Sequence, residues 1–291
     1  MAPWRRNPIP ASIRGRVEAL FAHTYLLLFG KLAAGGLLAL AVPPFSRMER
    51  GFYKSTGVVY LAMAYLMAAG EAYLYVTYRN LDIVSGASLA AWWLFTALFT
   101  AYCVTLFIDL PFLRARLFPV AVLAGIVALV ATAWGYVPDG ASLVAGVPYA
   151  ASLLAGAAIT GASTTGMLLG HWYLIDTGLD LEPLHNMLTY CRACLRLEIV
   201  VVVVGAVALY AWPGGPWAAS FDLAFGDRFR LLLMARVAAW TLALILAALI
   251  TRTLAIPQTM AATGLFYIQA LVVAVGQICG HWLLFRTGLP L

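Results

Sequence analysis

Several ionisable and amide side chains of this sequence lie inside long apolar runs, where they are costly to bury. When such residues occur within membrane spans, they usually face the protein interior and serve a function. If the runs cross a membrane in alternating directions from a cytoplasmic N-terminus, these side chains divide into two sets. One half of the membrane is predicted to hold His23, Lys31, Glu71, Arg236, Gln277 and His281, and the other half His171, His185, Arg192, Arg196 and Glu198.

The first set contains the partners of a buried ion pair. At a rise of about 1.5 Å per helical residue, Lys31 and Glu71 are expected to differ in depth by about 6 Å. A Lys–Glu pair is therefore geometrically possible in this half of the membrane.

The second set predicts a cationic pocket that contains imidazole groups. His185, Arg192 and Arg196 are spaced i, i+7 and i+11, which places them on one stripe of a helix. The connection from His171 to this stripe is short, so the stripe can face the end of the preceding helix. The alternative is that Arg192 and Arg196 extend to lipid headgroups while His171 anchors a helix end at the interface.

Such a pocket would suit a ligand with carbonyl or anionic oxygens. Quinone is the first candidate, because a neutral histidine can donate a hydrogen bond to a carbonyl and then exchange a proton with the reduced form. Haem b is the second candidate, with His171 and His281 as axial ligands and arginines on the propionates. No other metal site is expected.

Other motifs carry little chemistry. Cys191-x-x-Cys194 has redox or metal spacing, but no second pair accompanies it, and a helix in a membrane favours two small packing residues. The sequence has no Walker loop, His-Glu-x-x-His motif, nucleophile elbow or dinucleotide fingerprint. We therefore expect at most a quinone-reactive or electron-transfer subunit, and no self-contained enzyme.

The composition identifies the elements that must position these residues. Of 291 residues, 64% are hydrophobic and 10% charged, with a mean hydropathy of +0.91, against about 45–50% apolar and about 25% charged residues in globular domains. A soluble globular protein is excluded, and the apolar runs are too long and continuous for barrel strands. The sequence predicts an all-α, multi-pass membrane protein with spans near 21–43, 55–78, 86–109, 117–137, 143–174, 186–212, 229–252 and 258–286.

Residues 1–20 are predicted to form a juxtamembrane segment, and residues 21–291 a single transmembrane domain. An even number of spans places both termini on one side, and four early arginines favour the cytoplasm. The net charge is +6, and 16 of the 18 cations are arginine. They lie mostly at the ends of apolar runs, which indicates headgroup contacts in a lipid bilayer and no nucleic-acid binding.

One segment recurs within the chain. GMLLGHWYLIDTGLDL at 166–181 and GQICGHWLLFRTGLPL at 276–291 share nine of sixteen residues, and MAAGEAYL at 67–74 is a fainter copy. Arg-x-Arg pairs before each copy suggest repeat units of about 14–110, 114–213 and 228–291. Units of three helices would alternate in orientation, as in many secondary transporters. We also expect Gly166, Gly170, Gly276 and Gly280 to lie where helix backbones approach closely.

Three classes of function remain open. The first is a membrane subunit of a redox or respiratory complex that holds quinone, or haem b, near the histidine-containing clusters. The second is a small secondary transporter built on inverted repeats, and the third is a structural or assembly subunit without chemistry of its own. The expected partners are other membrane or peripheral subunits, or further copies of the chain in a homo-oligomer.

Overall fold

The structure is a computed structural model that describes residues 11–79, 83–108, 110–138, 140–176, 178–212, 215, 217–256 and 258–291, without the side chains of 11–14 and 16. Residues 1–10 of the predicted juxtamembrane segment lie outside the described residues. The remainder of that segment belongs to the first helix, which begins at Ala11.

The described residues form helices, turns and loops, with no strand among them. The helices are α1 (Ala11–Ala39), α2 (Arg50–Thr77), α3 (Gly86–Ile108), α4 (Pro111–Trp134), the 3-10 turn η2 (Leu143–Gly146), α5 (Val147–Ile175), α6 (Glu182–Tyr210), α7 (Ala218–Phe225), α8 (Asp227–Ala255) and α9 (Thr259–Thr287). Eight of them, all except α7 and η2, are long and apolar enough to cross a membrane. The chain is therefore a multi-pass helical membrane protein, as predicted; the short α7 was not expected.

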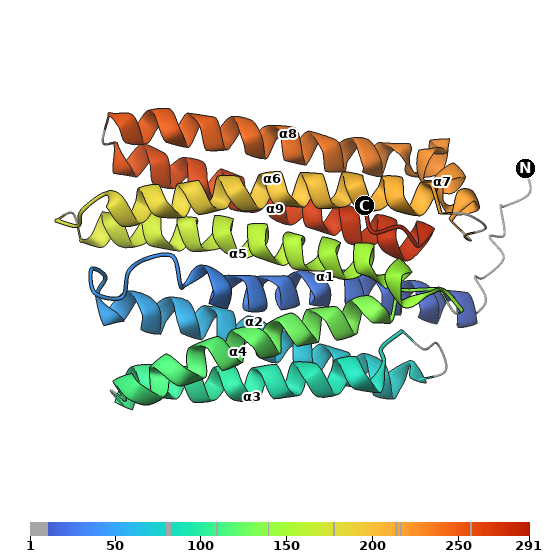
Figure 1. The fold of residues 1–291 in the computed structure, drawn as a ribbon, viewed down its shortest axis with the longest axis horizontal. Coiled ribbons are helices and arrows are strands. Elements are labelled where there is room, and N and C mark those ends of the chain that lie inside the picture. The colour runs from blue at the N-terminus through green and yellow to red at the C-terminus, as the bar shows by residue number, and fades with distance from the viewer. Residues whose placement is uncertain are drawn as a thin grey trace, which may run out of the picture.

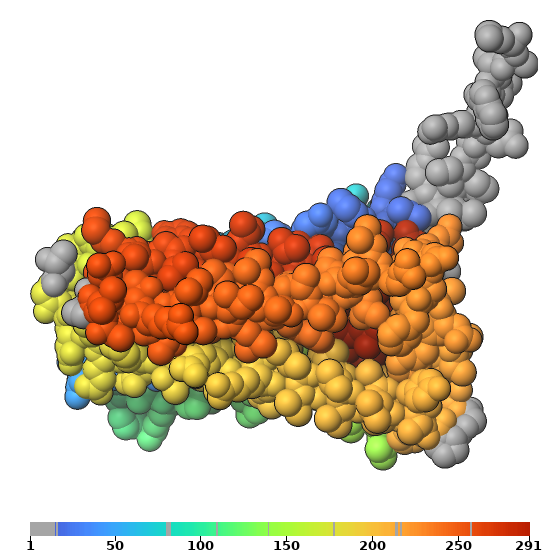
Figure 2. Space-filling view, turned by 90° about the horizontal axis from the view of Figure 1, so that it is seen from above, coloured from blue at the N-terminus to red at the C-terminus, as the bar shows by residue number. Residues whose placement is uncertain are grey.

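Local sequence explains where several helices begin and end. Pro111, Pro148 and Pro183 each lie in the first turn of a helix, where the missing N–H costs nothing and the fixed φ favours the helical conformation. Gly288 follows α9 with a φ of 74°, a left-handed conformation that glycine adopts without strain. The chain then turns back, and Leu289 and Leu291 are buried. Figure 2 shows these last residues, in dark red, recessed between α6, α7 and α8.

The long helices form two groups of four that lie side by side (Figure 1). In the first group α1, α2, α3 and α4 pack in a ring, and in the second α5, α6, α8 and α9 do the same. Helices α1 and α5 lie in the middle of the molecule and make the main contact between the groups. We call the two groups the N-half and the C-half.

Two short sequence patterns recur between the N-half and the C-half. Gly30 and Gly35 on α1 match Gly156 and Gly161 on α5, and the α3 segment Ser88-Leu-Ala-Ala-Trp92 matches the α8 segment Arg236-Val-Ala-Ala-Trp240. Because each half contributes four spans, matched helices run in the same direction. This pairing differs from the predicted three-helix units, and the similar segments 166–181 and 276–291 begin on α5 and α9, which are not matched helices.

The contact between the halves depends on glycine. A Cβ atom added to Gly35 would overlap the carbonyl of Ala157, and one added to Gly161 would overlap the backbone of Gly35. Only residues without a side chain allow the α1 and α5 backbones to come this close. Sequence reasoning had singled out other glycines and missed this crossing.

The four glycines of the repeated segment lie against neighbouring parts of the fold, but an added Cβ would meet side chains of other helices or, at Gly280, the carbonyl oxygen of Leu291, so the predicted contact between two helix backbones is not seen there. On α5, an added Cβ at Gly170 would lie 2.7 Å from the Thr263 hydroxyl oxygen of α9, and Gly166 faces Phe266 in the same way. On α9, an added Cβ at Gly280 would lie 3.2 Å from Arg236 Nε, and Gly276 faces the same arginine at 3.4 Å. In the C-half, glycine thus brings α9 close to both α5 and α8.

Candidate functional site

The most concentrated polar chemistry is an ionic network inside the C-half. The carboxylate of Glu198 on α6 accepts hydrogen bonds at Oε1 from Arg236 Nη2 on α8 at 2.6 Å and from Gln277 Nε2 on α9 at 2.5 Å. Its other oxygen accepts a bond from Trp240 Nε1 at 3.2 Å. Glu198, Arg236 and Gln277 are buried, so the carboxylate relies on these donors rather than on water.

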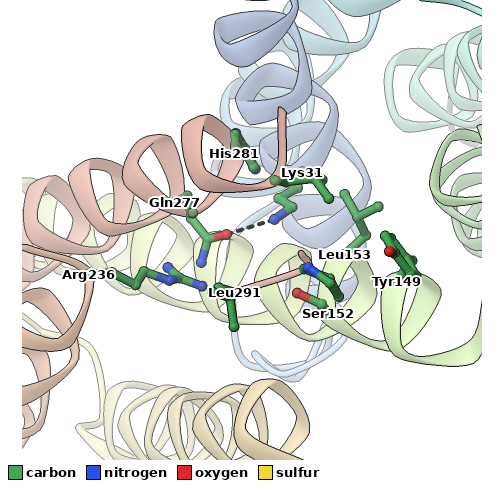
Figure 3. Close-up of a pocket in the computed structure, with 11 residues that line it drawn as sticks. Lys31, Tyr149, Ser152, Leu153, Arg236, Gln277, His281 and Leu291 are labelled. Atoms are coloured by element: carbon green, nitrogen blue, oxygen red, sulfur yellow. Dashed lines mark hydrogen bonds between the residues drawn. The ribbon is translucent and has the colours of Figure 1, made fainter. Parts of the chain in front are cut away.

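Lys31 joins this network from the other half of the molecule. Its Nζ on α1 donates to Gln277 Oε1 at 2.7 Å (Figure 3). Because Gln277 Nε2 donates to Glu198, one amide connects a lysine of the N-half to a carboxylate of the C-half. The predicted Lys31–Glu71 pair does not form, because the amide of Gln277 lies next to Lys31 and Glu71 faces α3. We call Lys31, Gln277, Glu198 and Arg236 the central network.

Gly156 makes room for the bond between Lys31 and Gln277. A Cβ atom added to this α5 residue would lie 2.6 Å from both Lys31 Nζ and Gln277 Oε1. The glycine is therefore part of the site, although it has no functional group.

Gly156→Ala is expected to break this hydrogen bond and to lower the free energy of unfolding by about 1–3 kcal/mol, because a buried ammonium and a buried carbonyl lose their partners. Thermal unfolding in detergent, followed by tryptophan fluorescence, measures the loss. The matched control is Gly264→Ala on α9, where an added Cβ would meet nothing within 4 Å. Equal melting temperatures for the two variants would show that Gly156 is not needed for the bond between Lys31 and Gln277.

A small cavity lies beside the central network. Its volume of about 10 Å³ is enough for about one water molecule. The lining includes Lys31, Ser152, Arg236, Gln277 and His281, labelled in Figure 3. Two buried atoms of these residues, Arg236 Nε and His281 Nε2, have no hydrogen-bond partner in the protein.

His281 connects the central network to α1. Its Nδ1 lies 3.1 Å from the backbone carbonyl of Thr24, which can only accept, so Nδ1 carries a proton that it donates to this carbonyl. Thr24 lies between His23 and Lys31 on α1. The imidazole of His281 is thus placed between the central network and His23.

A second buried carboxylate occupies the N-half. Glu71 on α2 accepts both bonds, at 3.0 and 3.1 Å, from the Ser88 hydroxyl of α3, and that hydroxyl lies 2.8 Å from the Thr132 hydroxyl of α4. Trp92 Nε1 donates to the same Thr132 oxygen at 2.9 Å. His23 Nε2 lies 3.9 Å from Glu71 Oε1.

The two carboxylates occupy matching places in the two halves. Glu71 and Glu198 each lie on the second long helix of their half. Each contacts a residue on the third long helix, and a tryptophan follows that residue four positions later. In the C-half that residue is Arg236, and in the N-half it is Ser88. Glu198 therefore faces a permanent cation, whereas the partners of Glu71 are neutral hydroxyls and His23, whose charge depends on protonation.

Tyr136 extends the N-half cluster to the loop after α4. Its hydroxyl lies 3.2 Å from His23 Nε2. Burial and the nearby Glu71 carboxylate raise the pKa of the Tyr136 phenol well above its usual value, so the hydroxyl stays protonated and can donate to the imidazole. Tyr136, His23 and Glu71 thus form one cluster, and His281, which contacts the Thr24 carbonyl next to His23, lines the cavity beside the central network.

The predicted pocket around His171 does not form. His171, His185 and Arg196 are exposed, His185 Nδ1 bonds its own helix at Leu181, and Arg192 lies 3.5 Å from the Thr251 hydroxyl. The buried stripe of α6 contains Met187, Cys191, Leu195 and Glu198 instead. The stripe of His185, Arg192 and Arg196 faces outward, and Glu198 belongs to the central network.

The two proposed axial ligands are too far apart for one haem. His171 lies 3.3 Å from the Tyr267 hydroxyl near the start of α9, and His281 is 14 residues further along that helix, about 21 Å at 1.5 Å per residue. Among the described residues, no group of three or more His, Cys, Asp or Glu side chains could hold a metal ion. Cys191 and Cys194 are free thiols in the core.

Sequence reasoning placed the six residues of the first set in one half of the membrane and Glu198 in the other. The structure places the six in or beside two buried clusters, and Glu198 contacts Arg236 and Gln277 of the first set, so its predicted place was wrong. Sequence reasoning missed their neutral partners Ser88, Trp92, Thr132, Tyr136 and Trp240. The signal that could have found three of them is the match between Ser88-x-x-x-Trp92 and Arg236-x-x-x-Trp240.

No protein-family model, curated protein or solved structure is similar to this chain. The fold and the site define its class: a multi-pass helical membrane protein whose long helices form two groups of four, with ionisable side chains buried among them.

Proposed function

We propose that this chain is a secondary transporter that moves protons through its buried polar groups. The observation that carries the proposal is the central network, which joins Lys31 of the N-half to Glu198 and Arg236 of the C-half through Gln277. In secondary transporters, coupling-ion sites lie near the bilayer midplane at the interface of structural repeats, including repeats of the same orientation.

The depth of the central network supports this proposal. Glu198 lies about two residues from the middle of α6, and Lys31 about three residues from the middle of the span Val17–Ala39. At about 1.5 Å per residue, both side chains start within about 5 Å of the midplane. Chains of Asp, Glu and His inside a membrane are typical of proton relays in pumps and transporters.

The proposed proton route has more ionisable side chains on one side of the central network than on the other. Toward the loop after α4, it passes His281, His23, Glu71 and Tyr136. In the opposite direction the next buried polar residue on α9 is Gln269, about 12 Å along the axis from Gln277, and its amide contacts the Cys191 thiol. The same side also holds the buried hydroxyls of Thr160, Ser163 and Thr165 on α5, and Thr165 bonds Tyr60. Ionisable groups thus lie on one side of the network and only neutral polar groups on the other, an asymmetry that suits alternating access rather than an open channel.

In the arrangement we propose, all eight long helices cross the bilayer, and both termini and the Tyr136 loop face the cytoplasm. The four N-terminal arginines support this orientation.

The quinone-holding redox subunit was the first class indicated by the sequence, but the residues on which it rested do not gather into a pocket. The transporter class therefore has the stronger support, although the matched halves are parallel and not inverted.

Proton flux into liposomes tests the proposal. We expect purified protein to admit protons under an imposed membrane potential, and Glu71→Gln and Lys31→Met each to lower the flux at least about tenfold, because general acid–base groups contribute at least this much. Glu18→Gln, which removes a carboxylate from the exposed surface of α1, is the matched control. Wild-type liposomes as proton-tight as empty ones, under potentials of either sign, would overturn the proposal.

A further inference from the structure

A second cavity lies at the opposite end of the bundle, between the α1–α2 loop and the start of α4. Its volume of about 350 Å³ falls in the range of small-molecule sites. It is lined by Pro43, Phe45, Tyr53, Tyr102, Arg114 and Phe118. We call it the Arg114 cleft; it shares no residue with the central network or with the N-half cluster.

Arg114 supplies an unused donor to this cleft. Its guanidinium lies over the Phe45 ring, 4.0 Å from the centroid, which fixes the plane of the group. Its Nη1 atom is buried and has no hydrogen-bond partner in the protein. A buried guanidinium nitrogen without an acceptor is costly, so an acceptor from outside the chain would be strongly favoured here.

Apart from Arg114, the side chains named above are apolar except for the two tyrosines. The Tyr53 hydroxyl donates to the Pro43 carbonyl at 2.6 Å, so its proton is already used. Phe118 and Pro43 offer apolar surface next to the guanidinium. A ligand that matches both features carries anionic oxygens on an apolar chain.

The position of the cleft identifies the source of such a ligand. Arg114 lies in the first turn of α4, which begins at Pro111, so the guanidinium is at the level where lipid headgroups meet the protein. The N-terminal end of a helix adds partial positive charge to the same place. We propose that the Arg114 cleft binds the phosphate of an anionic phospholipid, with an acyl chain against Phe118.

Lipid binding to the purified, delipidated full-length protein tests this inference. Phosphatidylglycerol is expected to bind in native mass spectra and to raise the melting temperature, whereas phosphatidylcholine, which carries its own cation, has a weaker effect. Arg114→Ala is expected to weaken phosphatidylglycerol binding about tenfold or more, which corresponds to one lost charge-assisted hydrogen bond. Each variant is compared with its own lipid-free melting temperature, so a change in fold stability does not mimic a binding defect.

The matched control is Arg116→Ala. Arg116 has the same charge, lies two residues along α4 and stacks on Phe112, but it is exposed and does not line the cleft. Equal effects of Arg114→Ala and Arg116→Ala would overturn the proposal, as would equal stabilisation by both lipids. Displacement of phosphatidylglycerol by a short-chain quinone, dependent on Arg114, would also overturn it, because the cleft would then be a quinone site.

Discussion

Replacing Glu198 with leucine is expected to lower the free energy of unfolding by about 3–5 kcal/mol, the cost of leaving one partner of a buried ion pair without its counter-charge. Arg236 would lose its 2.6 Å bond to the carboxylate, and the amide of Gln277 would lose its acceptor. Both donors are buried, and the single water that the adjacent cavity could hold carries no charge to balance Arg236. Unfolding of the purified protein in lipid–detergent bicelles, followed by tryptophan fluorescence, measures the loss.

The double variant Glu198→Leu with Arg236→Met separates loss of charge compensation from loss of packing. Removing both charges leaves no uncompensated ion at this position, so the double variant is expected to regain more than half of the loss seen in Glu198→Leu. If the losses of the two single variants simply add, the pair does not interact as the geometry indicates. A stable double variant without proton flux would further separate the role of the charges in transport from their role in folding.

The membrane class and the spans of the protein were predictable because they depend on composition and length. The long helices cover all the predicted spans to within a few residues. The charged and Pro/Gly clusters that end the apolar runs in the sequence also lie at or near the ends of the helices in the structure. Depth was predictable only in part. Counting residues placed His23 and Glu71 in the same half of the membrane, and the structure brings them within 3.9 Å of each other. The same count placed Glu198 in the other half of the membrane from Arg236 and Gln277, to which Glu198 is bonded.

The face that each helix turns inward was harder to predict. In a soluble protein an apolar stripe marks the buried side of a helix. In lipid the outward side is apolar too, so the period of the hydrophobic residues does not show which side is buried. On α6 the charged stripe of His185, Arg192 and Arg196 was expected to face inward and lies outside. Charged residues near the end of a span can reach headgroups, so only Glu198, near the middle of the helix, must be buried.

The repeated Gly-His-Trp motif shows the same limit. His171 and His281 occupy equivalent positions in the two similar segments, yet His171 is exposed and His281 is buried. The difference arises from neighbours that lie far away in the sequence, since α1 covers His281 and leaves His171 uncovered. Local similarity therefore predicted neither the groups that pack on the glycines nor the environment of the imidazoles.

Gly161→Ala is expected to be among the most damaging single-methyl substitutions in the chain. The added Cβ would overlap the backbone of Gly35, and neither backbone can yield as a side chain would, so α1 and α5 must separate. Overpacking typically costs about 1–3 kcal/mol, and a clash between two backbones is expected at or above the upper end of that range. The melting temperature and the monodisperse yield after detergent extraction measure the effect.

Gly57→Ala is the matched control, because Gly57 is also a buried helical glycine but an added Cβ would make only an ordinary contact, 3.5 Å from the Cys103 sulfur. Separation of α1 from α5 would also move Lys31 on α1 away from the α5–α9 pair that carries Gly156 and Gln277. The α1–α5 crossing therefore sets both the stability of the two-half fold and the geometry of the central network. If Gly161→Ala and Gly57→Ala have the same melting temperature, the halves are not held together at this crossing. The position of Lys31 must then depend on other contacts.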